Sequence, residues 1–255
     1  MRLQALPALR DNYIWTAADD DGGRALVVDP SEAGPVLAAA DAGLRPLGVL
    51  LTHHHPDHIG GVPGLLERWP DLPVFAPDDG RIPERYRRVG DGDTVELEPW
   101  RFEVLAVPGH TTSHIAYHGH GLLFCGDTLF SLGCGRLFEG TPAQMHASLS
   151  RLAALPPETR VCCGHEYTLA NGVFARVVEP GNPALDRRIE EAQAMRETGR
   201  PTLPSTLQTE RDTNPFLRVD HTAVRAAVAR QLGRDPADGV ETFAALRRWK
   251  DGFVA

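Results

Sequence analysis

The sequence predicts an α/β sandwich, with sheets inside and helices outside, followed by a helical C-terminal region. Two observations lead to this prediction. Through the first two thirds of the chain, short apolar runs alternate with turn residues and with helical patterns. Beyond residue 166 the patterns are helical, and segments rich in proline and threonine connect them. We therefore expect two domains, residues 1–166 and residues 167–255.

The strands of the first domain are expected where short apolar runs stop at turn residues. Residues 25–28 stop at Asp29-Pro30, and residues 48–51 lead directly into a cluster of histidines. Further strands are expected at residues 73–75, 94–97, 102–107, 114–118, 122–125 and 160–163. Helices are expected at residues 35–42, 59–68 and 143–154. In the second domain, which shows no strand alternation, helices are expected at residues 169–178, 183–197, 222–232 and 239–249.

The composition is typical of a soluble globular protein, with 42% apolar and 24% charged residues. Acidic side chains outnumber basic ones, 34 against 26, and the net charge of −8 argues against a nucleic-acid-binding surface. The first residues contain no apolar run typical of a signal peptide, and no segment approaches the roughly 20 apolar residues that span a bilayer. We therefore expect a cytoplasmic monomer with neither a nucleic-acid nor a membrane partner.

The four cysteines, Cys125, Cys134, Cys162 and Cys163, show no C-x-x-C spacing. Adjacent residues such as Cys162 and Cys163 are poorly suited to form a disulfide with each other. The sequence therefore predicts buried thiols at strand ends, and no metal ligands among them.

Four of the eleven histidines lie within six positions, in the segment Thr52-His-His-His-Pro-Asp-His58. His53 and His55 are two apart on an extended segment, so their side chains point to the same face. Pro56 keeps the preceding residue out of the helical region and suits the first turn of a helix, from which the aspartate and the last histidine project. This corner offers two pairs of metal ligands, more than one tetrahedral ion with an open position can use. The segment predicts a metal-dependent hydrolase and suggests two ions.

Further residues of the kind that bind metals follow later apolar strands. His110, Asp127 and His165 each come directly after an apolar run and one glycine. Alone, such a histidine more often forms an ordinary hydrogen bond or lies at the surface, and such an aspartate more often caps a turn. In combination with the histidine segment, these residues indicate one metal site assembled from several strand ends.

Together these motifs resemble the metallo-β-lactamase superfamily and, within it, the glyoxalase II family of hydroxyacylglutathione hydrolases. Segments that cover nearly the whole chain carry the closer resemblance: Pro108-Gly-His-Thr-Thr-Ser-His114, Gly126-Asp-Thr-Leu-Phe130, Gly133-Cys-Gly-Arg-Leu-Phe-Glu-Gly140, Gly164-His-Glu-Tyr167, Glu179-Pro-Gly-Asn182, Pro204-Ser-Thr-Leu207, Asn214-Pro-Phe216 and Arg247-Arg-Trp-Lys-Asp251. The resemblance implies an αββα sandwich, residues 1–166, with a C-terminal α-helical domain that binds glutathione, residues 167–255.

The resemblance also implies a dinuclear metal centre. His53, His55 and His110 would bind one ion, Asp57, His58 and His165 would bind the other, and Asp127 would bridge the two. Imidazole and carboxylate ligands suit zinc, which is our first expectation, and also iron and manganese. A metal-bridging hydroxide would be the nucleophile, with Asp57 and Asp127 as the catalytic carboxylates. The histidines outside this set, His54, His114, His118, His120, His146 and His221, are given no ligand role, and His54 is expected to support its neighbours or to be solvated.

The implied substrate is S-(2-hydroxyacyl)glutathione, chiefly S-D-lactoylglutathione, hydrolysed to glutathione and D-lactate in the second step of methylglyoxal detoxification. Arg247 and Lys250 lie three apart on an expected helix and so share a face. The resemblance assigns them to the glycine carboxylate of glutathione, whereas the residues alone would indicate a solvated helix face. Tyr167 is the implied tyrosine contact, and Arg136 matches a basic position. Phe138 stands where some relatives have tyrosine, so one hydroxyl contact would be absent.

Two other functions are compatible with the first histidine motif. An iron-dependent persulfide dioxygenase shares it and also acts on glutathione derivatives, but the C-terminal segments favour the thioesterase. A non-catalytic metal-binding member is disfavoured because no expected ligand is missing from the sequence. A β-lactam hydrolase would have no use for the helical tail.

Overall fold

The computed structural model describes residues 1–19 and 23–254, which form two compact units. The sheet unit comprises Met1–Ala106, Ser113–Gly126 and Cys162–Glu166. The helical unit comprises Val107–Thr112, Asp127–Val161 and Tyr167–Ala255. The chain passes between the units several times, and each unit is described by itself.

The first sheet of the sheet unit has the order β1-β2-β3-β4-β5-β6. Its strands are β1 (Arg2–Ala8), β2 (Asn12–Ala18), β3 (Arg24–Val28), β4 (Arg45–Leu50), β5 (Val74–Ala76) and β6 (Arg87–Arg88). The first three strands are antiparallel, and β3 to β6 run parallel to one another. Because parallel strands carry their carboxyl ends to one edge, the segments after β3 and β4 lie close together at that edge.

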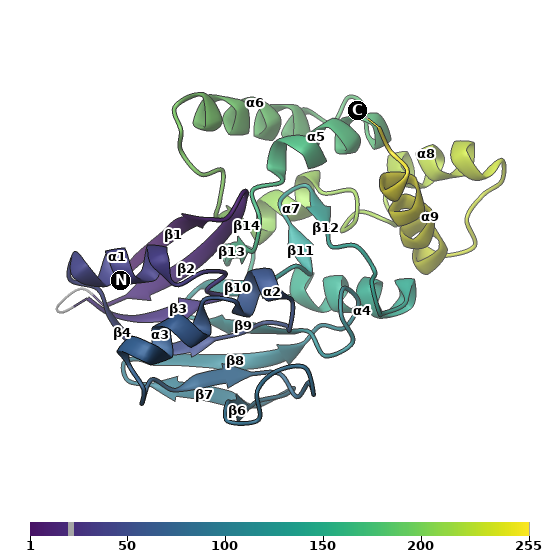
Figure 1. The fold of residues 1–255 in the computed structure, drawn as a ribbon. Helices are drawn as coiled ribbons and strands as arrows, with labels where there is room; N and C mark the ends of the chain where they lie inside the picture. The colour runs from purple at the N-terminus through teal and green to yellow at the C-terminus, as the bar shows by residue number, and fades with distance from the viewer. Residues whose placement is uncertain (20–22, 255) are drawn as a thin grey trace. The chain divides into compact units, whose positions relative to one another are not determined.

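The second sheet contains β7 (Thr94–Leu97), β8 (Trp100–Ala106), β9 (Ile115–Gly119) and β10 (Leu122–Gly126), with β10 next to the end of β13 (Arg160–Cys163). The Tyr117 hydroxyl of β9 donates to the Leu51 carbonyl oxygen after β4, at 3.0 Å, which joins the two sheets face to face. Helices α1 (Gly34–Asp41), α2 (Pro56–Ile59) and α3 (Val62–Arg68) accompany the first sheet in Figure 1. Val36, Val62 and Leu65 bury the apolar sides of α1 and α3 against it. The predicted α/β sandwich is confirmed.

The helical unit contains α4 (Pro142–Ala153), α5 (Thr168–Val178), α6 (Pro183–Glu197), α7 (Leu207–Thr213), α8 (Thr222–Leu232) and α9 (Gly239–Asp251). It also holds the hairpin β11 (Leu129–Phe130) and β12 (Gly133–Cys134), and β14 (Ser205–Thr206), which pairs with the first half of β13. Local chemistry fixes several helix starts. Thr141 and Gln144 form a capping box at α4, and the Asp238 carboxylate accepts from the Glu241 amide at α9.

One predicted element is wrong in detail. The helix expected at residues 59–68 is two helices, α2 and α3, which are interrupted at Gly60-Gly61. The Gly61 amide donates to the Pro30 carbonyl oxygen at 2.7 Å, and a Cβ at Gly61 would lie 2.4 Å from the carbonyl carbon of Glu32. The glycine pair therefore lets the chain after β3 approach the corner that carries the histidines. The short strand β14 likewise departs from the expectation of no strand in the second domain.

None of the helices that the structure describes combines the length and apolar character needed to cross a membrane. The four cysteines all lie in described segments; they are buried, and no disulfide joins them. The prediction of buried thiols is therefore confirmed.

Candidate active site

The corner between β4 and α2 carries the histidine segment, and its backbone has the expected shape. His55 is extended, with φ −60° and ψ 142°, and Pro56 occupies the first turn of α2. The rings of His53 and His55 lie on one side, with centroids 4.7 Å apart, and the His53 and His58 centroids are 4.1 Å apart. Strand alternation followed by a proline-initiated helical turn thus gathers three imidazoles at one point.

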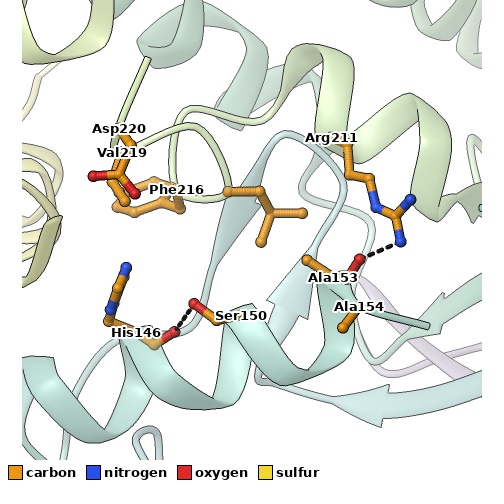
Figure 2. Close-up of a pocket in the computed structure, with 9 residues that line it drawn as sticks. His146, Ser150, Ala153, Ala154, Arg211, Phe216, Val219 and Asp220 are labelled. Atoms are coloured by element: carbon orange, nitrogen blue, oxygen red, sulfur yellow. Dashed lines mark hydrogen bonds between the residues drawn. The ribbon is translucent and has the colours of Figure 1, made fainter.

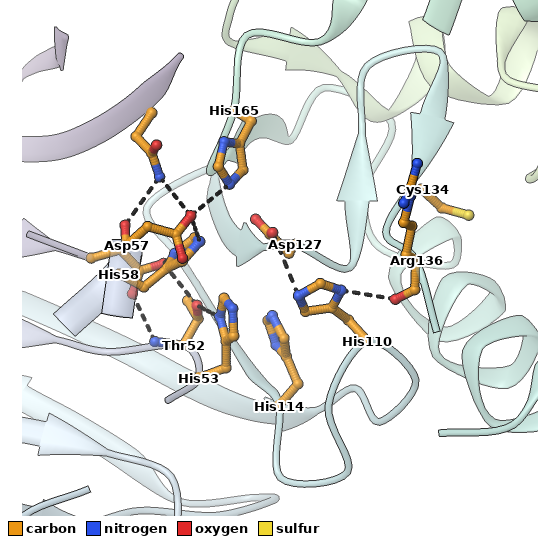
Figure 3. A network of polar contacts seen from close by, with 12 residues as sticks. Thr52, His53, Asp57, His58, His110, His114, Asp127, Cys134, Arg136 and His165 are labelled. Atoms are coloured by element: carbon orange, nitrogen blue, oxygen red, sulfur yellow. Dashed lines mark hydrogen bonds and ion pairs between the residues drawn. The ribbon is translucent and has the colours of Figure 1, made fainter. Parts of the chain in front are cut away.

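Asp57, His58 and His165 form a compact group in the sheet unit, with one possible ligand atom from each within 4.8 Å of the others. The Asp57 Oδ2 atom lies 3.4 Å from His165 Nε2 and 3.8 Å from His58 Nε2 (Figure 3). Two ligand atoms bound at about 2.1 Å to one tetrahedral ion are about 3.4 Å apart. The donor set and its spacing therefore fit a metal ion with no rearrangement of the backbone.

Two ligand candidates of the sheet unit, His58 and His165, use their Nδ1 atoms for hydrogen bonds within the protein. His58 Nδ1 lies 3.0 Å from Asp29 Oδ2, and His165 Nδ1 lies 2.8 Å from Asp11 Oδ1. A carboxylate partner accepts the Nδ1 proton, which leaves Nε2 as the nitrogen with a lone pair. Histidines that bind metals in proteins are held in this way.

His53 follows the same rule through a hydroxyl group. The Thr52 hydroxyl donates to Asp29 Oδ2 at 2.7 Å, and Thr52 Oγ1 lies 3.0 Å from His53 Nδ1. Because the hydroxyl proton is engaged by Asp29, His53 Nδ1 must act as the donor to Thr52, which again leaves the lone pair on Nε2. Asp29 therefore orients two histidines, one directly and one through Thr52.

His54 and His114, which the sequence left without a role as ligands, are both packed near the histidine segment. His54 Nδ1 lies 3.5 Å from Asp79 Oδ2, and its side chain is only 11% exposed, so of the two alternatives for His54, solvation does not fit. Hydrogen bonds from Arg81 outweigh burial and hold the pKa of Asp79 well below its usual range. The His114 ring stacks on His53, with centroids 4.5 Å apart and planes 17° from parallel.

The helical unit holds the two remaining predicted ligands. His110 Nε2 lies 3.6 Å from Asp127 Oδ2, and both residues are buried. The His110 Nδ1 atom lies 2.8 Å from the Arg136 carbonyl oxygen, an acceptor only, so this nitrogen donates and Nε2 keeps its lone pair (Figure 3). Gly135 makes this arrangement possible, because a Cβ there would lie 1.9 Å from the Asp127 carbonyl oxygen.

A cavity of about 440 Å³ in the helical unit brings together seven of the predicted site residues. It is lined by the two ligand candidates and by all five residues expected to contact substrate: His110, Asp127, Arg136, Phe138, Tyr167, Arg247 and Lys250. Its volume suits a small-molecule ligand. A net-acidic protein thus has a local pocket in which three cationic side chains converge.

Arg247 is buried, with 5% of its surface exposed. It therefore does not lie on a solvated helix face, which the residues alone would indicate. Its guanidinium donates to the Cys134 carbonyl oxygen at 2.9 Å and forms an ion pair with Asp251 at 2.9 Å. It also lies over the Phe216 ring. Burial raises the pKa of the neighbouring Cys134 thiol to about 11, against the opposing effect of Arg247. Arg247 therefore joins α9 to the β12 strand as well as facing the cavity.

Lys250 makes fewer polar contacts than Arg247. Its ammonium group donates to the Ala170 carbonyl oxygen at 3.3 Å and lies 5.4 Å from the centre of the Phe174 ring. Burial lowers the pKa of Lys250, and repulsion from Arg247 and Arg136 adds to the effect. Phe138, at 64% exposure, presents an open ring next to His110. A lysine with a single carbonyl partner at the limit of hydrogen-bond length can take a carboxylate ligand.

A second cavity of the helical unit, about 360 Å³, lies beside α4 and contains none of the predicted site residues (Figure 2). The Ser150 hydroxyl donates to the His146 carbonyl oxygen at 2.8 Å, and the Arg211 guanidinium donates to the Ala153 carbonyl oxygen. The contact of Arg211 completes the C-terminal end of α4, whereas Ser150 contacts a carbonyl inside the same helix.

The sequence patterns did not indicate Asp11, Asn12 or Asp29, which contact the ligand candidates of the sheet unit. Asp29 offered a signal, since it follows the apolar strand β3 as His110 and Asp127 follow theirs. Asp11 and Asn12 offered none, because the hairpin that they close was not predicted.

Two family models together match almost the whole chain. Residues 13–165 match the model described as metallo-β-lactamase superfamily, and residues 166–253 match the model described as hydroxyacylglutathione hydrolase C-terminus. A hydroxyacylglutathione hydrolase of Xanthomonas axonopodis pv. citri (strain 306) is 60% identical over 256 residues, which cover 100% of both chains. Identity at this level over the full length shows that the chain and this hydrolase belong to the same family.

Similar solved structures agree on the fold. The crystal structure of BLEG-1 B3 metallo-β-lactamase superposes with a TM-score of 0.64 at 23% identity, over 85% of this chain and 99% of the other. The crystal structure of TTHA1623 in a di-iron-bound form superposes with a TM-score of 0.59 at 29% identity, over 85% and 100%. The fold is therefore the metallo-β-lactamase fold with a helical C-terminal region, and the chain belongs to the hydroxyacylglutathione hydrolases, or glyoxalase II enzymes, of that superfamily.

Proposed function

We propose that this protein hydrolyses the thioester bond of S-(2-hydroxyacyl)glutathione, chiefly S-D-lactoylglutathione, to give glutathione and D-lactate. The observation that carries the proposal is the cavity of the helical unit. His110 and Asp127 line this cavity, and so do three cationic side chains: Arg136, Arg247 and Lys250. The two ligand candidates mark where the reaction would occur. The three cations mark where the carboxylates of glutathione would be bound.

We propose a centre of two metal ions, with the ligands that the sequence predicts. His53, His55 and His110 would hold one ion, Asp57, His58 and His165 the other, and Asp127 would bridge them. Support comes from the Nδ1 hydrogen bonds of His53, His58, His110 and His165, which leave four Nε2 lone pairs for metals. The di-iron-bound form of the similar structure TTHA1623 also favours two ions. Zinc is the proposed metal, and the same ligands suit iron and manganese.

Two divalent ions at such a site supply a water of lowered pKa and positive charge for a developing oxyanion. Asp57 and Asp127 contribute two negative charges that offset part of the charge of the ions. Lys250, with Arg136 and Arg247, would hold the glutathione moiety so that the thioester carbonyl lies beside His110 and Asp127. A thiolate leaves without prior protonation, so the proposed reaction needs no general acid.

The remaining proposals concern organisation and location. We propose a metallo-β-lactamase-like domain at residues 1–166 and a glutathione-binding helical domain at residues 167–255, in agreement with the extents of the two family matches. We further propose that the protein acts as a cytoplasmic monomer. Gel filtration with light scattering tests the monomer, for which a mass near 27.8 kDa is expected.

Hydrolysis of S-D-lactoylglutathione, followed by loss of thioester absorbance, tests the proposed function, with metal content and oxygen uptake measured on the same sample. We expect two metals per chain, release of glutathione and no oxygen uptake. One iron per chain with oxygen consumption on a glutathione persulfide would favour a persulfide dioxygenase instead. A metal-replete sample that leaves the thioester intact would contradict the proposal and indicate a non-catalytic metal-binding member.

A further inference from the structure

The hairpin of β1 and β2 closes directly against the ligand candidates of the sheet unit. Its two strands pair antiparallel from Arg2↔Ala18 to Ala8↔Asn12, so residues 9–11 form the turn. Two consecutive side chains, Asp11 at the end of the turn and Asn12 at the start of β2, reach two different ligands of the proposed metal.

The first contact orients an imidazole. Asp11 Oδ1 lies 2.8 Å from His165 Nδ1, and His165 is 5% exposed. A carboxylate that accepts the Nδ1 proton fixes the ring, selects the tautomer with the lone pair on Nε2, and makes that nitrogen a stronger donor to a metal.

The second contact orients a carboxylate. The Asn12 side-chain amide donates to Asp57 Oδ2 at 3.2 Å and to the Asp57 backbone carbonyl oxygen at 3.0 Å. The same Oδ2 atom lies 3.4 Å from His165 Nε2. Asn12 therefore fixes the rotamer of Asp57 relative to its own backbone, and the carboxylate points at the histidine that Asp11 orients (Figure 3).

These two side chains are not needed to attach the hairpin to the rest of the sheet unit. The Tyr13 amide donates to the Gly164 carbonyl oxygen at 2.8 Å, and the Glu166 amide donates to the Asp11 carbonyl oxygen at 2.9 Å. The Tyr13 hydroxyl donates to Glu166 Oε2 at 2.8 Å, and the Trp15 indole donates to the Cys163 carbonyl oxygen at 2.9 Å. Backbone and aromatic contacts already hold the segment that carries His165, so the side chains of Asp11 and Asn12 are available for another task.

We propose that Asp11 and Asn12 are positioning residues for the metal bound by Asp57, His58 and His165. Asp11 sets the ring of His165, and Asn12 sets the carboxylate of Asp57, so one turn of the chain fixes two of the three ligands. The inference rests on the proposed function, because it assumes that this group binds a metal.

Metal affinity of the full-length protein tests the inference. Asp11→Ala removes the contact with His165, and Asn12→Ala removes the two hydrogen bonds to Asp57. Tyr13→Phe is the matched control, because it removes a hydrogen bond from the same hairpin to Glu166, which is not a proposed ligand. Metal content is followed during titration with EDTA, and the melting temperature of the metal-free protein is measured in parallel. We expect one of the two metals to be bound roughly 10- to 100-fold more weakly in both alanine variants. Tyr13→Phe should leave metal affinity unchanged.

The variant Asp11→Asn separates positioning from a merely structural role. It keeps an oxygen that accepts the His165 proton and removes the charge, so its metal affinity should lie between those of wild type and Asp11→Ala. Equal metal affinities in wild type and both alanine variants would overturn the inference, as would a loss in Tyr13→Phe as large as theirs. A wild-type chain that binds no metal at the Asp57 group would instead contradict the proposed function itself.

Discussion

The histidine corner of the sheet unit and the cavity of the helical unit differ in how the sequence brings their side chains together. At the corner, the side chains that face a common point come from Thr52 to His58, and alternation along an extended strand aligns them. In the cavity, Arg136, Tyr167 and Lys250 come from segments more than 100 residues apart at their extremes, and only tertiary folding brings them together. Four of the seven proposed metal ligands therefore lie in one short segment, whereas the residues proposed to recognise the substrate come from distant parts of the chain.

The two regions also hold their charged groups differently. At the corner, His53 and His58 donate from Nδ1 to partners set by the fold, Thr52 and Asp29 respectively. In the cavity, Arg247 is bound to Asp251 and Cys134, while Lys250 contacts one carbonyl oxygen at 3.3 Å. Lys250 is therefore the cation on which substrate affinity should depend most directly. Arg247 should contribute to stability as well.

The largest effect is expected at Asp127, which belongs to the helical unit but serves the metal chemistry. Asp127→Ala should lose metal and reduce kcat by roughly 10³-fold or more, because it removes the carboxylate proposed to bridge the ions. Elemental analysis and kcat on the same sample measure both effects. Retention of two metals with near-normal kcat would show that Asp127 is not a bridging ligand.

A large effect on stability is expected at Glu179, a buried carboxylate of the helical unit outside the cavity. The Arg218 guanidinium donates to both of its oxygens, at 2.9 Å and 2.7 Å. Arg218→Ala should destabilise the protein by about 3 kcal/mol, because it removes two charge-assisted hydrogen bonds from a buried carboxylate whose remaining partners, Asn182 and His221, do not replace the guanidinium. Urea denaturation measures the change, and metal content should stay at the wild-type level.

The same ion pair predicts a dependence of stability on pH. Burial alone would raise the pKa of Glu179, but hydrogen bonds from Arg218 and Asn182 lower it below the usual 4.5. Because the folded-state pKa is the lower one, the contribution to the free energy of unfolding is fully present above about pH 4.5. It is lost as the pH falls through the folded-state pKa. Wild type should lose this part of its stability on acidification, and Arg218→Ala should show a smaller loss.

A moderate effect, confined to binding, is expected at Lys250. Lys250→Ala should raise KM about 10-fold and leave kcat nearly unchanged, because the ammonium contacts a part of the substrate that does not react. Burial lowers the pKa of Lys250, so this side chain loses its charge at a pH below the usual lysine pKa of 10.5. As the pH rises, the KM of wild type should therefore begin to increase before pH 10.5 is reached. Lys250→Arg retains its charge and should show no such rise. A flat KM profile in wild type would contradict the role of Lys250.

The smallest effect is expected at Phe138, whose exposed ring faces the cavity. Phe138→Tyr adds a hydroxyl that can reach the substrate and should lower KM by a factor of about 5 or less, the value of one additional hydrogen bond. Phe138→Leu is the matched control, because it changes the side chain without adding a polar group. Equal KM values for Phe138→Tyr and wild type would show that the hydroxyl finds no partner.

Much of the fold was predictable where the local pattern decides the structure. The strand at residues 160–163 and the helices at residues 183–197 and 222–232 have the predicted bounds. The β1–β2 hairpin was not predicted. Strand β2 is buried along its whole length and shows no alternation, and Pro7 interrupts the pattern of β1. Gly60 and Gly61 divide a predicted helix because the chain after β3 passes within contact distance, which no local pattern reveals.

The same distinction applies to the site. Spacing alone was enough to propose His53, His55 and His58 as metal ligands. Asp11 could not be identified in this way, because it meets His165 across 154 positions of the sequence. Asp29 follows an apolar strand, but its contact with His58 across 29 positions was not predictable from that pattern. The expectation for Cys134 was incomplete, since its carbonyl oxygen accepts from Arg247 and helps to build the cavity. Residues that hydrogen-bond to a proposed ligand or substrate contact are brought there by tertiary structure. The proposed ligands themselves can be recognised from short sequence motifs.

We expect the proposed metal ligands to carry out the reaction and the cavity residues to recognise glutathione. The most direct test of this claim compares two thioesters. S-D-Lactoylglutathione and the D-lactoyl thioester of N-acetylcysteamine share the reacting bond, but the second lacks the carboxylates of glutathione. We predict that wild type has a much higher kcat/KM for the glutathione thioester, and that Lys250→Ala lowers this value about 10-fold while leaving kcat/KM for the short thioester unchanged. An equal loss of kcat/KM on both thioesters in Lys250→Ala would contradict the account.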